Sequence, residues 1–410
     1  MKLFIIPKPV LNNQMEVIAY CFRYKRVNAN FFEQPMYAFD DAASPLCLSL
    51  LNSVGLEGFT NGIQTFVPIN KLSLLTDIEN QCSEPPEKII FLLSKDIPTE
   101  DVFLDSIKRL KGLGFRFAFE NIKDYSGLDS VLELCDFLFL SLDMNGYNET
   151  AANISHKYGN LKLVLTDVDD MKSFDEVKYT KFSLFEGKFF CVPTTKEYNT
   201  ISPIKVNSIQ LINTIRDEDF DIGDIAKVVG QDPSLSIALM KFVNSPYLGL
   251  NQQIKTIQHA VAMLGQKEVR KWVTTATAEM LASDKPDEIT KLSLMRAKLA
   301  ENLAPSFEMA IHAPSLFLMG LFSILDAVLE MPMVEALKII NVSDEIQKAL
   351  VSLEGKYAKV LELIYKYETA DWNDVYRLTV LHNIDAADVF SAYMDAVNWY
   401  KSIASGNVEG

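Results

Sequence analysis

The sequence predicts an α/β domain that closes into a (β/α) barrel, followed by an all-α domain that forms a helical bundle. Short β-branched and aromatic runs alternate with helical segments over about 190 residues, which is typical of a parallel sheet. The second half contains almost no strand-like runs. The composition also changes near residue 200, because all five cysteines precede it and all three tryptophans follow it.

The elements of the first half follow from its apolar runs and the breaks between them. The strand candidates cover residues 17–22, 65–69, 89–93, 115–119, 137–140, 161–165 and 182–184. The helical candidates cover residues 45–51, 100–113, 128–134 and 150–158. A segment with Pro193, Pro203 and several threonines then indicates a linker over 192–206. We therefore place the two domains at residues 1–195 and 196–410.

The second half reads as consecutive helices. Asp232 occupies an N-cap position and Pro233 the first helical position, where its missing N–H costs nothing. Gly265 ends a helix over 257–264 in the way a C′ glycine does. Further helices are predicted over 287–303, 316–329, 345–353, 356–368, 371–383 and 386–401. The apolar segment 316–329 is expected at the centre of the bundle.

Composition excludes several function classes. A net charge of −15 argues against a nucleic-acid-binding surface. The longest nearly uncharged stretch, 310–325, is shorter than the roughly 20 residues of a membrane span, and the apolar run 3–6 is too short for a signal peptide. Five scattered cysteines predict reduced thiols in a cytoplasmic protein. Among them, Cys21 and Cys135 lie in apolar patterns and are expected to be buried and inert.

The block 220–273 resembles the HDOD family. The residues that carry the resemblance are Gln231-Asp232-Pro233 before a helix, Asn244-Ser245 after it, and Ala260 to Leu264-Gly265. The resemblance implies a domain that is similar to HD-type phosphohydrolases but has lost the metal site and serves as a signalling or interaction module.

The histidines agree with that loss. An HD hydrolase needs a His-Asp dipeptide, because imidazole and carboxylate groups together hold its metals. The chain has four histidines, and none precedes an aspartate: His156, His259, His312 and His382. By the resemblance, Ser323 and Ile324 stand at the His-Asp positions. His259 is interpreted as a helix-surface or packed residue.

The first half resembles the EAL family, the barrel phosphodiesterases of cyclic dimeric GMP. The resemblance covers roughly residues 1–195 and rests on 7–10 with 17–20, on 66–70, on 114–121 and on 185–193. It implies a barrel of EAL type. In that family the metal ions are held by oxygen ligands at the ends of the strands.

Few of these ligands are present by the same resemblance. The first glutamate falls at Cys21, the third-strand glutamate at Leu92 or Leu93, and the later acid pair at Thr166 and Asp167. The lysine falls within 137–141, which contains none. The vestigial site positions are Asn70, Glu120, Asn121 and Glu186. We expect no catalytic residue, no metal and no cofactor, and Asn70, Glu120 and Asp143 are interpreted as residues that cap or solvate loop ends.

The sequence therefore predicts a non-catalytic bacterial signalling protein of EAL–HDOD type that acts through protein contacts. The expected partner is another signalling protein, or a second copy of the chain. Tyr247, Leu248 and Leu250 are candidate contacts, because a loop aromatic anchors well; the alternative is a loop that folds onto its own core. Two further alternatives are a residual cyclic di-GMP phosphodiesterase and a cyclic di-GMP sensor whose phosphates would bind Arg23, Arg26 or Arg116.

Overall fold

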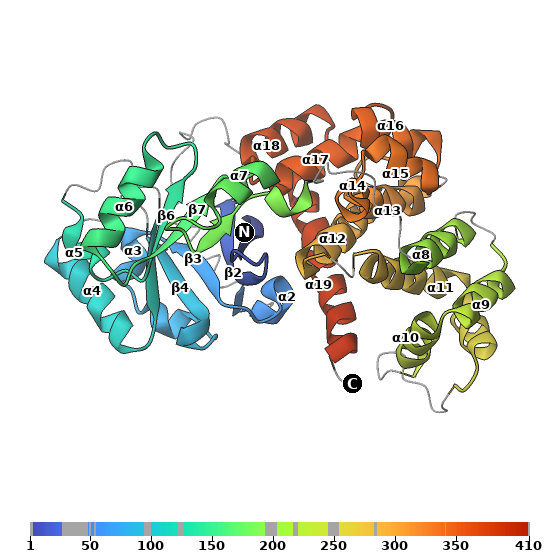
Figure 1. Ribbon diagram of the computed structural model, residues 1–410, viewed down its shortest axis with the longest axis horizontal. Coiled ribbons are helices and arrows are strands. Elements are labelled where there is room, and N and C mark those ends of the chain that lie inside the picture. The colour runs from blue at the N-terminus through green and yellow to red at the C-terminus, as the bar shows by residue number, and fades with distance from the viewer. Residues whose placement is uncertain are drawn as a thin grey trace. The chain divides into compact units, whose positions relative to one another are not determined.

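Eight strands close into a barrel in the order β1 to β8 (Figure 1). They are β1 Leu3–Leu11, β2 Val17–Arg26, β3 Thr65–Ile69, β4 Ile89–Leu93, β5 Arg116–Glu120, β6 Phe137–Ser141, β7 Lys162–Thr166 and β8 Leu184–Glu186. Strand β1 is antiparallel to β2 and β8, whereas each pair from β2–β3 to β7–β8 is parallel. The predicted barrel is confirmed.

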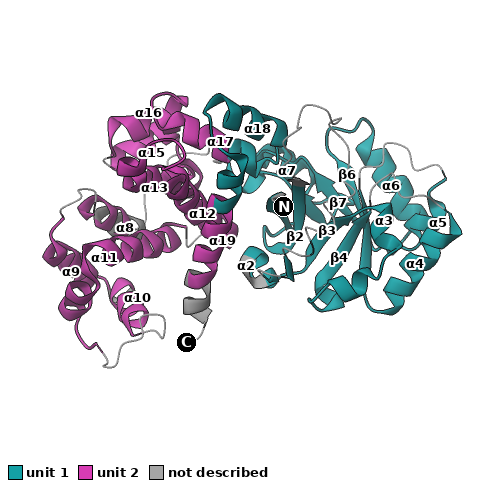
Figure 2. Cartoon of the chain, turned by 180° about the vertical axis from the view of Figure 1, so that it is seen from behind, with its two compact units in different colours: residues 1–192, 365–391 teal, residues 193–364, 392–410 magenta. Residues whose placement is uncertain are grey.

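The chain divides into two units, which Figure 2 colours separately. The computed structural model describes residues 3–26, 48, 51–52, 55–93, 100–120, 127–192, 203–215, 220–244, 254–282, 285–340 and 342–408. Unit 1 combines Met1–Val192 with Tyr365–Ser391, and unit 2 combines Pro193–Ile364 with Ala392–Gly410. Residues 365–391, which the sequence-based boundaries place in the helical domain, thus pack with the barrel. The boundaries of the domains themselves stay a prediction.

Strand β1 is absent from the strand candidates because Pro7 and Pro9 interrupt its pattern. Backbone N–H groups in an antiparallel strand point alternately to its two edges. The N–H of Ile5 points away from β2, since it donates to Tyr367 instead. Residues 7 and 9 share that orientation, so their missing N–H groups remove no bond to β2.

The helices between Met1 and Val192 lie outside the strands (Figure 1). They are α2 Leu56–Thr60, α3 Lys71–Leu74, α4 Asp101–Gly112, α5 Asp129–Leu132, α6 Tyr147–Lys157 and α7 Met171–Val177. Helices α4, α5 and α6 overlap the predicted segments 100–113, 128–134 and 150–158, whereas α2, α3 and α7 were not predicted. Most of the predicted helix 45–51 lies outside the described residues.

Apolar side chains fill the barrel interior. They come from all strands and include one buried thiol: Val10, Ala19, Cys21, Phe66, Ile90, Leu92, Ala118, Phe137, Phe139, Val164 and Leu184. Phe66 contacts Phe137 and Phe139 edge to face, with ring centroids 5.1 and 5.0 Å apart. The interior is therefore a packed core, so chemistry is confined to the ends of the strands.

Helices make up the rest of the described chain. They are α8 Pro203–Thr214, α9 Ile222–Gln231, α10 Pro233–Val243, α11 Ile257–Leu281, α12 Asp287–Leu303, α13 Ala313–Phe322, α14 Leu325–Leu329, α15 Met333–Ile339, α16 Asp344–Ser352, α17 Ala358–Glu368, α18 Trp372–Leu381 and α19 Ala386–Val408. Helices α8 to α11 share one apolar core. Pro203 begins α8, so the end of the predicted linker is helical.

The central apolar segment differs from its prediction. The single helix expected over 316–329 is two helices, because α13 ends at Phe322 and α14 begins at Leu325. Gly320 lies against α12, where a Cβ atom would meet the carbonyl oxygen of Arg296 at 2.4 Å. An apolar run shows burial but not a break within it, which explains the error.

Candidate functional site

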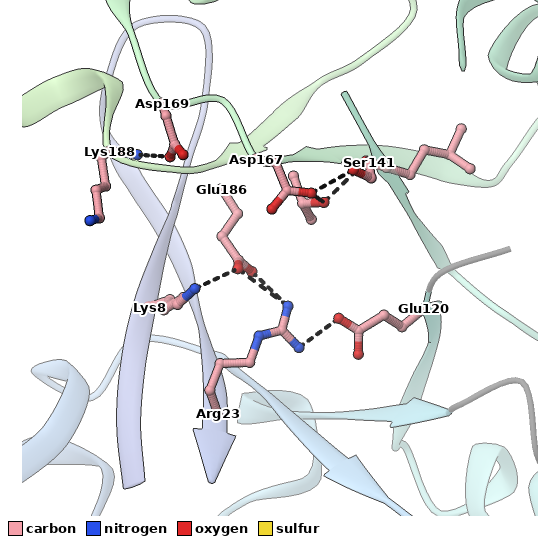
Figure 3. A network of polar contacts seen from close by, with 10 residues as sticks. Lys8, Arg23, Glu120, Ser141, Asp167, Asp169, Glu186 and Lys188 are labelled. Atoms are coloured by element: carbon pink, nitrogen blue, oxygen red, sulfur yellow. Dashed lines mark hydrogen bonds and ion pairs between the residues drawn. The ribbon is translucent and has the colours of Figure 1, made fainter. Parts of the chain in front are cut away.

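Charged side chains gather where the parallel strands end, and we call this group the mouth (Figure 3). Its members are Lys8 of β1, Arg23 of β2, Glu120 of β5 and Glu186 of β8. Strands β2, β5 and β8 run in the same direction, so their carboxyl ends meet at one end of the barrel. In barrels of this kind that end carries the functional residues.

Arg23 is the centre of the mouth. Its guanidinium lies 2.6 Å from Glu120 Oε1, and its Nη2 donates to both carboxylate oxygens of Glu186 at 3.2 Å. Lys8 Nζ lies 4.0 Å from Glu186 Oε1. Two cations thus face two carboxylates, and the charges within the group balance.

Burial and the neighbouring charges together set the pKa values of Glu120 and Arg23. Burial raises the pKa of Glu120, and the positive charge of Arg23 opposes this shift without cancelling it. Burial pulls the pKa of Arg23 down, but the surrounding negative groups more than offset it, so its pKa stands above the ordinary value. Arg23 is therefore a fixed positive charge.

Cys21 lies two residues before Arg23 on β2. Cys21 is buried in the barrel interior, and burial raises the pKa of its thiol well above the ordinary value. Burial likewise raises the pKa of Cys135 to about 12. Both cysteines were expected to be buried, and the structure confirms this. A neutral thiol is a poor nucleophile and a poor metal ligand.

Asn70 follows β3 and caps a helix. Its Oδ1 accepts from the backbone N–H of Ser73 at 2.8 Å and from the Ser73 hydroxyl at 2.9 Å. Asp143 is exposed in the loop after β6. These positions agree with the capping and solvated-loop interpretation for Asn70 and Asp143. For Glu120 the same interpretation is wrong, because its side chain is 16% exposed and forms an ion pair with Arg23. Asn121 lies outside the described residues.

A second polar group follows β6 and β7. Asp167 Oδ2 accepts from the hydroxyls of Ser141 at 2.6 Å and Thr166 at 2.9 Å (Figure 3). Asp169 Oδ1 accepts from the backbone N–H of Lys188 at 3.2 Å. Both aspartates are exposed, and their contacts fix the loops beside the mouth.

The metal cluster implied by the EAL resemblance can be tested against these donors. Hard divalent cations need several free oxygen ligands. At the mouth, Glu120 and Glu186 are already paired with Arg23, Asn70 Oδ1 accepts from Ser73, and Cys21 and Leu92 belong to the apolar core. The donors do not fit a two-metal cluster. In the described part of the chain, no three His, Cys, Asp or Glu residues are grouped so as to hold a metal ion.

In unit 2, Ser323 lies beside an arginine. Arg296 is buried on α12, and its Nη1 donates to Ser323 Oγ at 3.1 Å and to the Ser323 carbonyl at 3.3 Å. Burial raises the pKa of nearby Asp326, and Arg296 partly opposes this. His259 is exposed on α11. The position assigned to the His-Asp pair thus has a guanidinium beside it.

The residues of the HDOD resemblance have structural roles. Asp232 Oδ1 accepts from the N–H of Leu235 at 3.2 Å, and α10 begins at Pro233, as predicted. Asn244 donates to the carbonyls of Met240 and Ile254 and accepts from the N–H of Ile254 at 2.8 Å. Asn244 therefore joins the end of α10 to the segment before α11.

Of the remaining positions, only Gly265 is among the described residues. Gly265 interrupts α11 with a φ of 70°, which agrees with the predicted helix end, although the helix resumes after it. Ser245, Tyr247, Leu248 and Leu250 lie outside the described residues.

The sequence patterns did not indicate the roles of two members of the mouth. They gave Arg23 only the role of a phosphate ligand, and they gave Lys8 no role in the site. The period of two along a strand places Arg23 on the face of Cys21, which is the signal that could have located it. Arg116, another of the three arginines proposed as phosphate ligands, begins β5 at the opposite end of the barrel and contacts Gln64 and the Glu87 carbonyl. The side chain of Arg26 is not described.

A family model of known proteins matches most of the helical part of the chain. Residues 202–360 match the family model of the HDOD domain. Uncharacterized protein YuxH of Bacillus subtilis is 26% identical over 409 residues, covering 97% of this chain and 98% of that protein. Cyclic di-GMP phosphodiesterase CdgJ of Vibrio cholerae is 25% identical over 404 residues, covering 98% of this chain and 93% of that protein.

Solved structures of EAL proteins are similar to the barrel part. PaMucR phosphodiesterase in complex with c-di-GMP has a TM-score of 0.39 and 13% identity over 46% of this chain and 94% of that chain. An EAL domain protein from Listeria monocytogenes has a TM-score of 0.36 and 15% identity over 46% of this chain and 87% of that chain. The chain therefore combines an eight-stranded barrel with an HDOD domain. No described helix is long and apolar enough to cross a membrane.

Proposed function

We propose that this chain is a non-catalytic regulator of bacterial signal transduction, which acts by binding another protein in a pathway that uses cyclic di-GMP. The observation that carries the proposal is the ion-paired mouth. A divalent cation at this place would have to displace Arg23 from Glu186, which is buried, and from Glu120, which is partly buried. Removing one member of a buried charge pair is strongly unfavourable, so the arrangement favours the ion-paired state.

The cyclic di-GMP pathway follows from the relatives rather than from the mouth. CdgJ is named as a cyclic di-GMP phosphodiesterase and aligns over nearly all of this chain. The HDOD match supports a role as a signalling or interaction module.

The same relative favours one alternative, a residual cyclic di-GMP phosphodiesterase. The two functions are separated by incubating the full chain with cyclic di-GMP and excess Mn²⁺ and measuring linear product. The regulator predicts no protein-dependent product. Product that disappears in Asn70→Ala and Glu120→Ala, but persists in the exposed control Asp143→Ala, would establish the enzyme instead.

A sensor that binds without cutting is the other alternative. Its ligand phosphates would compete with Glu120 and Glu186 for Arg23, the described arginine at the mouth. A ligand bound at 100 times its Kd stabilises the folded state by about 2.7 kcal/mol. A thermal shift with cyclic di-GMP that is lost in Arg23→Met and kept in Arg116→Met would identify a sensor, and the regulator predicts no shift.

Partner binding is tested with the full chain as bait in a bacterial extract. The candidate contacts predict that Tyr247→Ser with Leu250→Ser removes a captured protein. The matched control is Ile311→Ser, which removes an apolar side chain that is 85% exposed elsewhere in the described chain. Equal capture by both variants would reject Tyr247 and Leu250 as contact residues.

A further inference from the structure

The outer edge of β1 is covered by a segment from far along the chain. Strand β8 pairs with β1 only at Val10 and Leu11, so β8 leaves the outer edge of the earlier residues of β1 uncovered. At Ile5, this edge meets the hydroxyl of Tyr367. The hydroxyl accepts from the Ile5 N–H at 3.3 Å and donates to the Ile5 carbonyl at 3.1 Å. One side chain therefore satisfies both backbone groups of an edge residue.

Aromatic packing reinforces this contact. Phe4 stacks on Trp372 with ring centroids 5.6 Å apart and an interplanar angle of 9°. Tyr367 meets Phe4 and Trp372 edge to face at 5.8 and 5.2 Å. Phe4 and Tyr367 are almost fully buried, and Trp372 is buried with them. Such clusters contribute more than their buried area alone.

The segment that supplies these rings has a fixed turn. We call Tyr365–Ser391 the strap, and it contains the end of α17, all of α18 and the start of α19. Lys366 Nζ lies 3.1 Å from Asp371 Oδ2 and 2.5 Å from Asp374 Oδ2. Asp371 also caps α18 by accepting from the N–H of Asp374 at 3.2 Å. The turn between α17 and α18 thus holds Tyr367 and Trp372 on either side of it.

The strap lies next to the mouth. Because β1 and β2 are antiparallel, the start of β1 accompanies the end of β2, and Ile6 stands opposite Arg23. Phe4 and Lys8 share one face of β1, since side chains alternate with a period of two. The ring that contacts the strap and the lysine that contacts Glu186 are therefore on the same face of the same strand.

We propose that the strap is a built-in coupling element, which holds the β1–β2 hairpin and through it the position of Arg23. Residues 364 and 392, on either side of the strap, belong to unit 2. A change in the helical unit that pulls on the strap would loosen the hairpin and alter the charges of the mouth. Coupling of this kind is reciprocal, so a change at the mouth also alters strap docking. The inference does not depend on whether the mouth is catalytic.

The test uses hydrogen exchange and thiol labelling in the full chain. Tyr367→Phe removes both hydrogen bonds to Ile5 and keeps the ring, and Tyr357→Phe is the control at a buried tyrosine outside the strap. We expect Tyr367→Phe to raise exchange of the Ile5 amide roughly tenfold, which corresponds to the loss of about one net hydrogen bond.

Cys21 reports on the hairpin, because it lies on β2 opposite Lys8 and is buried. Peptide mass spectrometry after maleimide treatment compares it with Cys135, a second buried thiol of unit 1. We expect Tyr367→Phe to raise labelling of Cys21 relative to Cys135. If Tyr367→Phe raised the labelling of Cys21 and Cys135 by the same factor, the whole barrel would be opening. That result would overturn local coupling. If the Ile5 amide exchanged no faster in Tyr367→Phe than in the control Tyr357→Phe, the strap contact itself would be overturned.

Discussion

Replacing Arg23 with Met tests the ion-paired mouth directly. The change removes a guanidinium that contacts two carboxylates and keeps an unbranched apolar stem in its place. The side chains of Arg23, Glu120 and Glu186 are 19%, 16% and 6% exposed, so solvent compensates little for the loss. Removing one partner of a buried pair costs about 3–5 kcal/mol. Lys8 stays 4.0 Å from Glu186 and partly compensates, so we expect about 3 kcal/mol.

The expected loss depends on pH, with a sign set by Glu120. Burial already raises the folded-state pKa of Glu120 above the ordinary 4.5, and removing Arg23 raises it further. A group with a raised folded pKa contributes stability below its unfolded pKa and loses it as the pH rises through the folded pKa. The deficit of Arg23→Met is therefore expected to be largest at pH 7.5 and smaller at pH 5.

The assay is urea unfolding followed by the fluorescence of Trp372, which lies in unit 1, with Trp272 and Trp399 replaced by Phe. The control is Arg109→Met, which breaks an exposed pair with Glu79 and should cost about 0–1 kcal/mol. A deficit at pH 7.5 no greater than that of the control, or one that does not shrink at pH 5, would refute the reasoning.

Three other predictions concern single positions. Gly187→Ala would place a Cβ atom 1.8 Å from the Val168 carbonyl oxygen, so we expect a severe loss of stability, measured by circular dichroism melting. In Gly112→Ala the new Cβ atom meets nothing within 4 Å, so we expect the folded state to gain about 0.5–1 kcal/mol. A folded Gly187→Ala protein with an unchanged melting curve would contradict this packing. Asn244→Ala removes three backbone contacts, and we expect faster exchange of the Ile254 amide with a loss of about 1–3 kcal/mol. Unchanged exchange at Ile254 would contradict the role of Asn244.

Local patterns predicted the barrel strands better than its opening hairpin. The run 65–69 lies between two parallel neighbours and has the bounds predicted for it, because its apolar and β-branched residues outweigh its single proline, Pro68. Strand β1 contains two prolines, which a sequence pattern penalises, and it tolerates them because their missing N–H groups face away from β2. Propensity describes single residues, whereas the tolerance of a proline depends on which edge of the strand is paired.

The mouth was predictable only in part. The resemblance to the EAL family indicated Glu120 and Glu186 as site positions, but it indicated neither Lys8 nor the central place of Arg23. No local pattern shows that Arg23 contacts both Glu120 and Glu186. Arg23 and Glu186 are 163 residues apart in the sequence and meet only when the barrel closes. The contact of Tyr367 with Ile5 spans 362 residues and has no signal in a single sequence.

The interrupted path of the chain through unit 1 has a consequence for biosynthesis. Domains generally fold from the N-terminus while the ribosome is still adding residues. Here the first strand must wait, with Phe4 and the Ile5 backbone uncovered, until Tyr367 and Trp372 have been translated. The nascent barrel therefore exposes a strand edge throughout synthesis of the HDOD domain, and a gene fragment that stops at residue 192 would encode a protein with that edge permanently open.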